Sequence, residues 1–108
     1  MYKDTSILVV DDNRQVLELV NHVLAEAGYS ISFIPKGQFL FQRLSSQKFD
    51  LVLLDINLPG ISGFDLLRQL KSDPVFKTLP VIIISAEEED DTLAKCFALG
   101  ASDYIKKP

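Results

Sequence analysis

The stretch LVLLDINLPG, from Leu51 to Gly60, decides the fold of this chain. Four apolar residues run directly into Asp55, and the Pro59-Gly60 pair closes the segment. A short apolar run that ends at turn residues predicts a strand buried on both faces of a parallel sheet. Its last residue then lies at the carboxyl edge of the sheet, where open α/β folds bind ligands. Because burying an isolated carboxylate is costly, we expect Asp55 to be hydrated, paired or bound to a metal.

Apolar strands and amphipathic helices alternate on both sides of this stretch. Apolar runs predict strands at residues 6–10, 31–34, 51–54, 81–84 and 103–105. A helical period predicts helices at residues 14–27, 38–47 and 63–72, and a fourth helix into which the acidic run 87–91 leads. This alternation predicts the α/β class, with a doubly wound, five-stranded parallel sheet that carries helices on both faces.

The helical period also assigns apolar residues to each predicted helix. The expected inward residues are Val16, Leu17, Val20, Val23, Leu24 and Ala27 in the first helix, Phe39, Leu40 and Leu44 in the second, and Phe64, Leu67 and Leu70 in the third. The fourth helix carries Leu93, Ala94, Phe97 and Ala98. We expect Cys96 to be a core residue and not a reactive thiol.

Composition narrows the classes of function. The 108 residues suggest a single domain, and a hydrophobic content of 47% is sufficient for a core. The net charge of -4 argues against non-specific nucleic-acid binding. A single cysteine rules out an internal disulfide, and no apolar stretch resembles a signal peptide or could span a bilayer. We therefore expect a soluble cytoplasmic domain with no direct nucleic-acid or membrane partner.

Polar residues end four of the predicted strands, namely Asp11 and Asp12, Asp55, Ser85 and Lys107. The ends of parallel strands share one edge, so these side chains can converge. Three neighbouring carboxylates repel one another, and a hard cation such as Mg²⁺ relieves that repulsion. A hydroxyl and an ammonium beside them suit a phosphoryl group. The inferred chemistry is a phosphoryl group on a carboxylate, held by Mg²⁺ and a lysine.

Each of these residues also has a simpler interpretation. Paired acids such as Asp11 and Asp12 are often a helix cap and a solvated charge. Ser85 could satisfy a strand end, and Lys107 could be a surface lysine. The combination of all of them in register with Asp55 favours the metal site.

In this arrangement the chain resembles the receiver domain of two-component response regulators, from Ile7 to Pro108. The matching pieces are Asp11-Asp12, Asp55-Ile56-Asn57-Leu58-Pro59, Gly63, Ser85-Ala86, Gly100-Ala101-Ser102-Asp103-Tyr104 and Lys107-Pro108. Any single piece is a weak signal, but all of them in order on the expected elements are specific. The resemblance implies a flavodoxin-like sheet with the strand order 2-1-3-4-5.

The resemblance implies Asp55 as the phosphoacceptor and Mg²⁺ as the cofactor. Asp12, Asp55 and the backbone carbonyl of Asn57 would bind the ion, and Asp11 would act mainly through water.

Three further residues would act on the phosphoryl group. Ser85 stands where the family often has threonine, keeps the hydroxyl and would donate a hydrogen bond to a phosphoryl oxygen. Lys107, which precedes the proline, would contact the phosphate. Tyr104 would be an aromatic switch that turns inward when Ser85 moves, although it could also be a static, half-buried aromatic.

The implied function is a phospho-accepting signalling switch of a two-component phosphorelay. A histidine kinase or histidine phosphotransfer protein would donate the phosphoryl group, and the added charge would bias a surface around the fourth helix and fifth strand. That surface would serve an output domain or self-association. The domain would assist its own phosphorylation and dephosphorylation without being an enzyme in the usual sense.

Two alternative functions stay open. One is a Mg²⁺-dependent aspartyl-phosphate hydrolase of the haloacid-dehalogenase kind, which expects an Asp-x-Asp pattern that Asp11-Asp12-Asn13-Arg14 lacks. The other is a receiver-like interaction module that is not phosphorylated.

The chain departs from the resemblance at its end, because the family has a fifth helix after the Lys-Pro pair. We expect residues 1–108 to be one receiver domain, truncated before that helix. The first and fifth helices would share one face of the sheet. Without the fifth, apolar residues of the central strands would lose their cover on that face.

Overall fold

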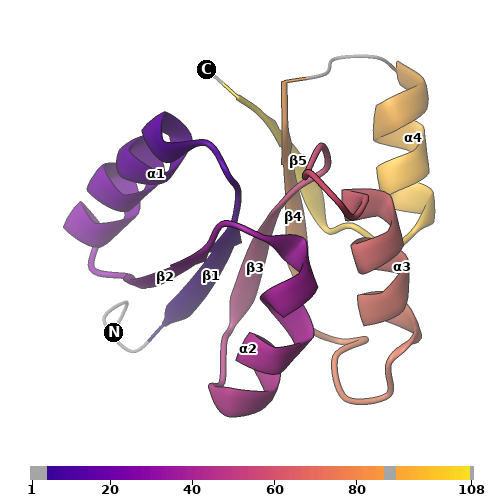
Figure 1. Cartoon of the computed structure of the whole chain (residues 1–108), viewed down its shortest axis with the longest axis horizontal. Helices are drawn as coiled ribbons and strands as arrows, with labels where there is room; N and C mark the ends of the chain where they lie inside the picture. The colour runs from indigo at the N-terminus through magenta and orange to yellow at the C-terminus, as the bar shows by residue number, and fades with distance from the viewer. Residues whose placement is uncertain (1–4, 87–89, 108) are drawn as a thin grey trace.

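The computed structural model describes residues 5–86 and 90–107. Within them the chain forms one parallel sheet of five strands, in the order β2-β1-β3-β4-β5 (Figure 1). The strands are β1 (Ser6–Val10), β2 (Ser30–Ile34), β3 (Leu51–Asp55), β4 (Val81–Ser85) and β5 (Asp103–Lys106). The predicted fold class and strand order are therefore confirmed. β1 has the predicted range, and each of the other four strands is one residue longer at one end.

Four α-helices and one short 3-10 helix connect these strands in the described residues. They are α1 (Arg14–Glu26), η2 (Gly37–Phe39), α2 (Leu40–Ser46), α3 (Gly63–Ser72) and α4 (Asp90–Ala98). Figure 1 shows α1 on one side of the sheet and α2, α3 and α4 on the other. Of the predicted acidic run, residues 87–89 lie outside the described residues.

Alternate strand residues supply two separate apolar cores, as the two-residue period of a strand requires. The larger core lies between the sheet and the three helices α2–α4, and it includes Leu8, Val52 and Ile83 from the strands. The smaller core contains Ile7, Val9, Leu53 and Ile84, with Leu17, Val20 and Leu24 of α1 among the half-buried residues around it. The sheet is thus fully covered on one face and covered by a single helix on the other.

Predictions of helix faces were correct for the residues nearest the sheet and wrong at the margins. Val23 is 54% exposed and Phe39 is 45% exposed, although both were expected to face the core. In α4 the buried residues are Thr92 and Cys96, and Phe97 is 48% exposed. The prediction that Cys96 is a core residue is confirmed.

An apolar groove of about 490 Å³ runs along the face of the sheet beside α1. It is lined by Thr5, Ile7, Val16, Leu19, Val20, Val23, Leu24, Tyr29, Leu51, Leu53, Ile82, Ile84, Ile105 and Lys106. The groove explains the exposure of Val23, because this side chain points to a part of the face that α1 alone does not cover. Among the described residues, no helix has the length and apolar character that crossing a membrane requires.

Candidate functional site

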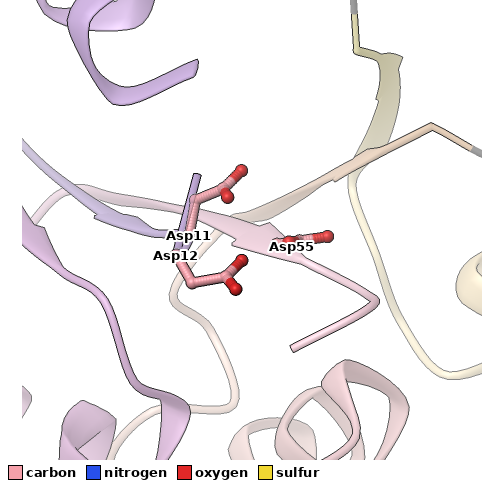
Figure 2. Close-up of side chains that lie close together, drawn as sticks. All are labelled: Asp11, Asp12 and Asp55. Carbon is pink, nitrogen blue, oxygen red and sulfur yellow. The ribbon is translucent and has the colours of Figure 1, made fainter. Parts of the chain in front are cut away.

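Two neighbouring strands bring the acidic residues together. In the ladder between β1 and β3, Val10 lies beside Leu54, so the next residues of the two strands, Asp11 and Asp55, leave the sheet side by side. Figure 2 shows Asp11, Asp12 and Asp55 at this edge, and one carboxylate oxygen from each lies within 4.8 Å of the others. Asp11 and Asp55 are buried, whereas Asp12 is exposed. The predicted convergence of three carboxylates is therefore confirmed.

The start of α1 shows whether Asp11 and Asp12 cap this helix or are available for a metal. The side chain of Asn13 accepts hydrogen bonds from Gln15 N at 2.9 Å and Val16 N at 3.2 Å, so Asn13 is the N-cap of α1. Asp11 Oδ1 accepts the N–H of Asn13 at 2.8 Å and fixes the turn between β1 and α1. The cap is therefore supplied without Asp12, and the alternative that the acid pair serves as a helix cap is wrong.

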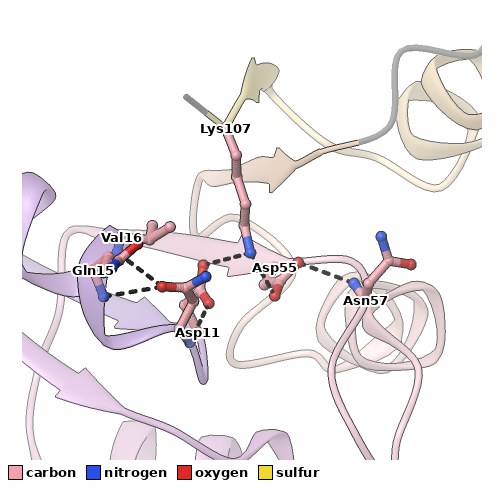
Figure 3. Close-up of polar contacts among 7 residues, drawn as sticks. Asp11, Gln15, Val16, Asp55, Asn57 and Lys107 are labelled. Carbon is pink, nitrogen blue, oxygen red and sulfur yellow. Dashed lines mark hydrogen bonds and ion pairs between the residues drawn. The ribbon is translucent and has the colours of Figure 1, made fainter.

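Lys107, directly after β5, reaches across the carboxyl edge to both buried acids. Its Nζ lies 3.0 Å from Asp11 Oδ2 and 3.0 Å from Asp55 Oδ2, as Figure 3 shows. Its backbone N–H donates to Ser85 O at 2.7 Å, which holds the end of β5 against β4. The side chain of Lys107 is 14% exposed, so the ammonium is withdrawn from solvent and directed at the carboxylates.

The electrostatics of the site follow from burial and charge. Burial raises the pKa of Asp55 above its usual value, and repulsion from Asp11 adds to this, while hydrogen bonds from Asn57 N and Lys107 oppose it. Burial by itself would lower the pKa of Lys107, but its hydrogen bonds and its attraction to Asp55 and Asp11 raise it overall. The lysine thus stays protonated at neutral pH.

The donor set fits a hard divalent cation. Asp11 Oδ2 is buried and, within the described chain, accepts no hydrogen bond of good geometry, although Lys107 stands 3.0 Å away as an ion-pair partner. A buried carboxylate oxygen without a hydrogen bond of good geometry, beside two more carboxylates, suits a charged ligand. Three carboxylates, with solvent access at the exposed Asp12, suit Mg²⁺, which keeps several waters.

The other predicted site residues lie on the expected elements. Ser85 is fully buried at the end of β4 and Asn57 follows β3, where its N–H donates to Asp55 Oδ1 at 3.0 Å. Tyr104 lies on β5 beside Ile83 and packs, half-buried, against the larger core. It therefore faces the side of the sheet that carries α4. Asn13 was missed as a positioning residue, although an Asn directly before a helical period is a known start signal.

Comparison with known proteins agrees with this geometry. Residues 7–108 match the family model of the response regulator receiver domain. The chain belongs to this family. Receiver domains are signalling switches that generally bind Mg²⁺ at an acidic pocket, and they are not enzymes in the usual sense.

Three proteins illustrate the similarity. The receiver is 38% identical over 103 residues to the phosphate regulon transcriptional regulatory protein PhoB of Pseudomonas aeruginosa. The matched segment covers 95% of the receiver and 45% of PhoB. The BeF3-activated N-terminal receiver domain of Klebsiella pneumoniae RstA has a TM-score of 0.88 and 30% identity, covering 96% of the receiver and 88% of that chain. The phosphorylated cyanobacterial phytochrome response regulator RcpA has a TM-score of 0.89 and 28% identity, covering 96% and 81%. The receiver spans less than half the length of the curated relatives that it matches first.

Proposed function

We propose that this receiver accepts a phosphoryl group on Asp55 and acts as a switch in a two-component phosphorelay. The observation that carries the proposal is the ammonium of Lys107, held 3.0 Å from both Asp55 and Asp11 at the carboxyl edge of the sheet. A structural ion pair needs one acid for one lysine, whereas this ammonium contacts two buried acids and a third carboxylate lies within 4.8 Å of them, an arrangement that suits a cation. The phosphorylated RcpA and the BeF3-activated RstA receiver, which share this fold, support the proposal.

The transfer step uses the residues of the site as follows. A carboxylate oxygen of Asp55 attacks the phosphorus of a phosphohistidine on a kinase or phosphotransfer protein, a P–O bond forms, and the P–N bond breaks toward the histidine, which takes a proton. Lys107 offsets the charge of the transferred oxygens, and the hydroxyl of Ser85 donates a hydrogen bond to one of them. Asp12, Asp55 and the Asn57 carbonyl would hold Mg²⁺, with Asp11 acting mainly through water, and the ion supplies further charge neutralisation when bound.

The switch would be read out on the surface of α4 and β5. A phosphoryl group adds a charge of about -1.5 to -2 at neutral pH. Ser85 ends β4 at the site, and Tyr104 lies on the adjacent strand β5 beside Ile83. Phe97 is 48% exposed on α4 and offers an apolar contact to an output domain or to a second copy. We place this signalling in the cytoplasm, with a histidine kinase or phosphotransfer protein as the donor.

Phosphorylation by acetyl phosphate, with and without Mg²⁺, tests the proposal. The receiver should reach one phosphoryl group per chain with Mg²⁺, and Asp55→Asn or EDTA should abolish the product, which intact-mass spectrometry measures. Asp50→Asn is the matched control, because Asp50 precedes the same strand at its opposite end. Equal labelling of Asp55→Asn and the wild type would contradict the proposal. Repeated turnover of a free phosphoester would favour the hydrolase instead, and no labelling at all would favour the interaction module.

A further inference from the structure

The loop between β3 and α3, residues 56–62, carries the backbone carbonyl expected to bind the metal. Both ends of the loop are fixed by hydrogen bonds. Ile56 N donates to Ile84 O at 3.3 Å, Asn57 N donates to Asp55 Oδ1 at 3.0 Å, and Gly63 N returns to Ile56 O at 3.1 Å. The peptide groups on either side of Asn57 are therefore set by contacts at the two ends of the loop.

Gly63 touches the backbone of the phosphoacceptor directly. A Cβ at this position would lie 2.5 Å from the carbonyl oxygen of Asp55 and 2.5 Å from Cα of Ile56. These are backbone atoms of the strand end, so they cannot rotate away as a side chain could. The backbone of Gly63 is helical and not among those with positive φ, so the requirement for glycine here is one of space.

Gly37, in the connection between β2 and α2, packs against the same loop. A Cβ there would lie 2.9 Å from Ile61 Cγ2 and 3.1 Å from Leu58 Cδ1, both in the loop, and 2.6 Å from Leu66 Cδ1 in α3. These atoms are the ends of side chains, so they can yield to a larger extent than the backbone at Gly63. The two glycines thus allow close approach to the loop at its end and along its length.

We propose that Gly63, supported by Gly37, is a positioning residue of the metal and phosphoryl site. By admitting the Asp55–Ile56 peptide in close contact with α3, Gly63 sets the direction of the Asp55 carboxylate and of the Asn57 carbonyl. An added methyl group moves that peptide and misaligns two of the oxygens offered to the cation. The inference rests on the proposed function, since it concerns the same Mg²⁺ site.

Mg²⁺ titration followed by backbone amide chemical shifts tests the inference without any phosphoryl donor. Gly63→Ala should weaken Mg²⁺ binding by about 10-fold to 100-fold, the range seen when groups that orient metal ligands are changed. Gly37→Ala should weaken it by a smaller factor. The amide signal of Asn57 should also shift in metal-free Gly63→Ala.

Gly100→Ala is the matched control for lost stability. Gly100 has φ of +106°, and its added Cβ would lie 2.9 Å from Lys71 Cγ, far from the site in the connection before β5. This variant should lose thermal stability and keep the Mg²⁺ affinity of the wild type. An equal loss of affinity in Gly100→Ala, or unchanged affinity in folded Gly63→Ala, overturns the inference.

Two further outcomes keep the test decisive. If Gly63→Ala does not fold, Gly37→Ala decides, and unchanged Mg²⁺ affinity in that variant overturns the inference. If the wild type itself shows no Mg²⁺-dependent shifts at Asp12 and Asn57, the proposed function fails together with the inference. If the wild type, Gly63→Ala and Gly37→Ala all bind Mg²⁺ with equal affinity, the inference is wrong but the proposed function stands.

Discussion

Asp55 is a buried carboxylate beside another buried carboxylate, so its charge opposes folding while no cation is bound. Its pKa in the folded chain lies above the usual value of 3.8 because of burial. The folded state therefore binds more protons than the unfolded state from pH 3.8 upward, and this contribution to stability is lost as the pH rises through the folded pKa. Asp55→Asn should remove this pH-dependent loss of stability, because asparagine does not ionise.

We expect Asp55→Asn to be more stable than the wild type in EDTA at neutral pH by on the order of 1 kcal/mol, or about 4–8 °C in melting temperature. The difference should shrink toward acid pH, where Asp55 is protonated in the wild type. Excess Mg²⁺ should reverse its sign, because only the wild type keeps the full ligand set. Thermal denaturation over pH checks this, and an Asp55→Asn variant that is less stable in EDTA contradicts it.

At the scale of single residues, the sequence predicted those site members that end strands. Asp55, Ser85 and Lys107 each follow an apolar run, so the parallel sheet alone brings them to one edge. Gly63 was recognised only by its spacing. Its steric role depends on how closely α3 approaches β3, and that distance comes from packing of the whole helix and is not encoded in a local pattern.

Helix α4 contacts helix α3 through a side chain on its exposed face, which reaches the first turn of α3. Lys95 Nζ lies 4.2 Å from the centre of the Phe64 ring, within the range of a cation–π interaction. Phe64 follows Gly63, so the contact joins the proposed output helix to the start of α3. It restrains the position of α4 from outside the phosphoryl site.

Lys95→Met should lower the free energy of unfolding by about 0.5–1 kcal/mol. Lys95→Arg should keep most of this stabilisation, because the guanidinium also carries a positive charge. Urea denaturation of Lys95→Met, Phe64→Leu and the double variant measures the coupling. Lys48→Met, which removes an exposed lysine from the connection between α2 and β3, is the control for loss of charge. Additive effects of the two single changes would show that the ring and the ammonium are not coupled.

At the scale of elements, the existence and order of helices and strands followed from the sequence, but the buried face of α4 did not. The apolar residues Ala94, Phe97 and Ala98 are exposed, while Thr92 and Cys96 are buried. The helical period by itself favoured the face with Ala94, Phe97 and Ala98, but α4 packs with Thr92 and Cys96 toward the core. An exposed Phe97 fits a surface that another molecule covers.

At the scale of the whole molecule, the described residues leave an apolar groove beside α1. Its floor includes Leu53 and Ile82, from the two strands β3 and β4, and Ile105 at its margin is 48% exposed. We propose that a further helix after β5 covers this groove, so that residues 1–108 are the main part of a single receiver domain. A second chain is the alternative cover.

Extending the chain beyond Pro108 by about a dozen native residues, the length of an average helix, should raise the melting temperature and reduce self-association. Thermal denaturation and analytical ultracentrifugation of the 108-residue and extended chains measure both effects. If the 108-residue chain is already monomeric and gains no stability from the extension, the groove needs no cover and the proposal is wrong. An Ile82→Ser change should lower self-association of the shorter chain if the groove mediates it.

The long sequence separation within the site has a consequence for the newly made chain. Asp55 and its partner Lys107 are 52 residues apart, and at ribosomal rates of 5–20 residues per second the lysine is made about 3 to 10 seconds after the aspartate. During that interval β1 and β3 can pair while their acids lack the counter-charge. In the proposed function, a nascent chain therefore presents no complete acceptor site until β5 has joined the sheet, so the site forms only after all five strands are made.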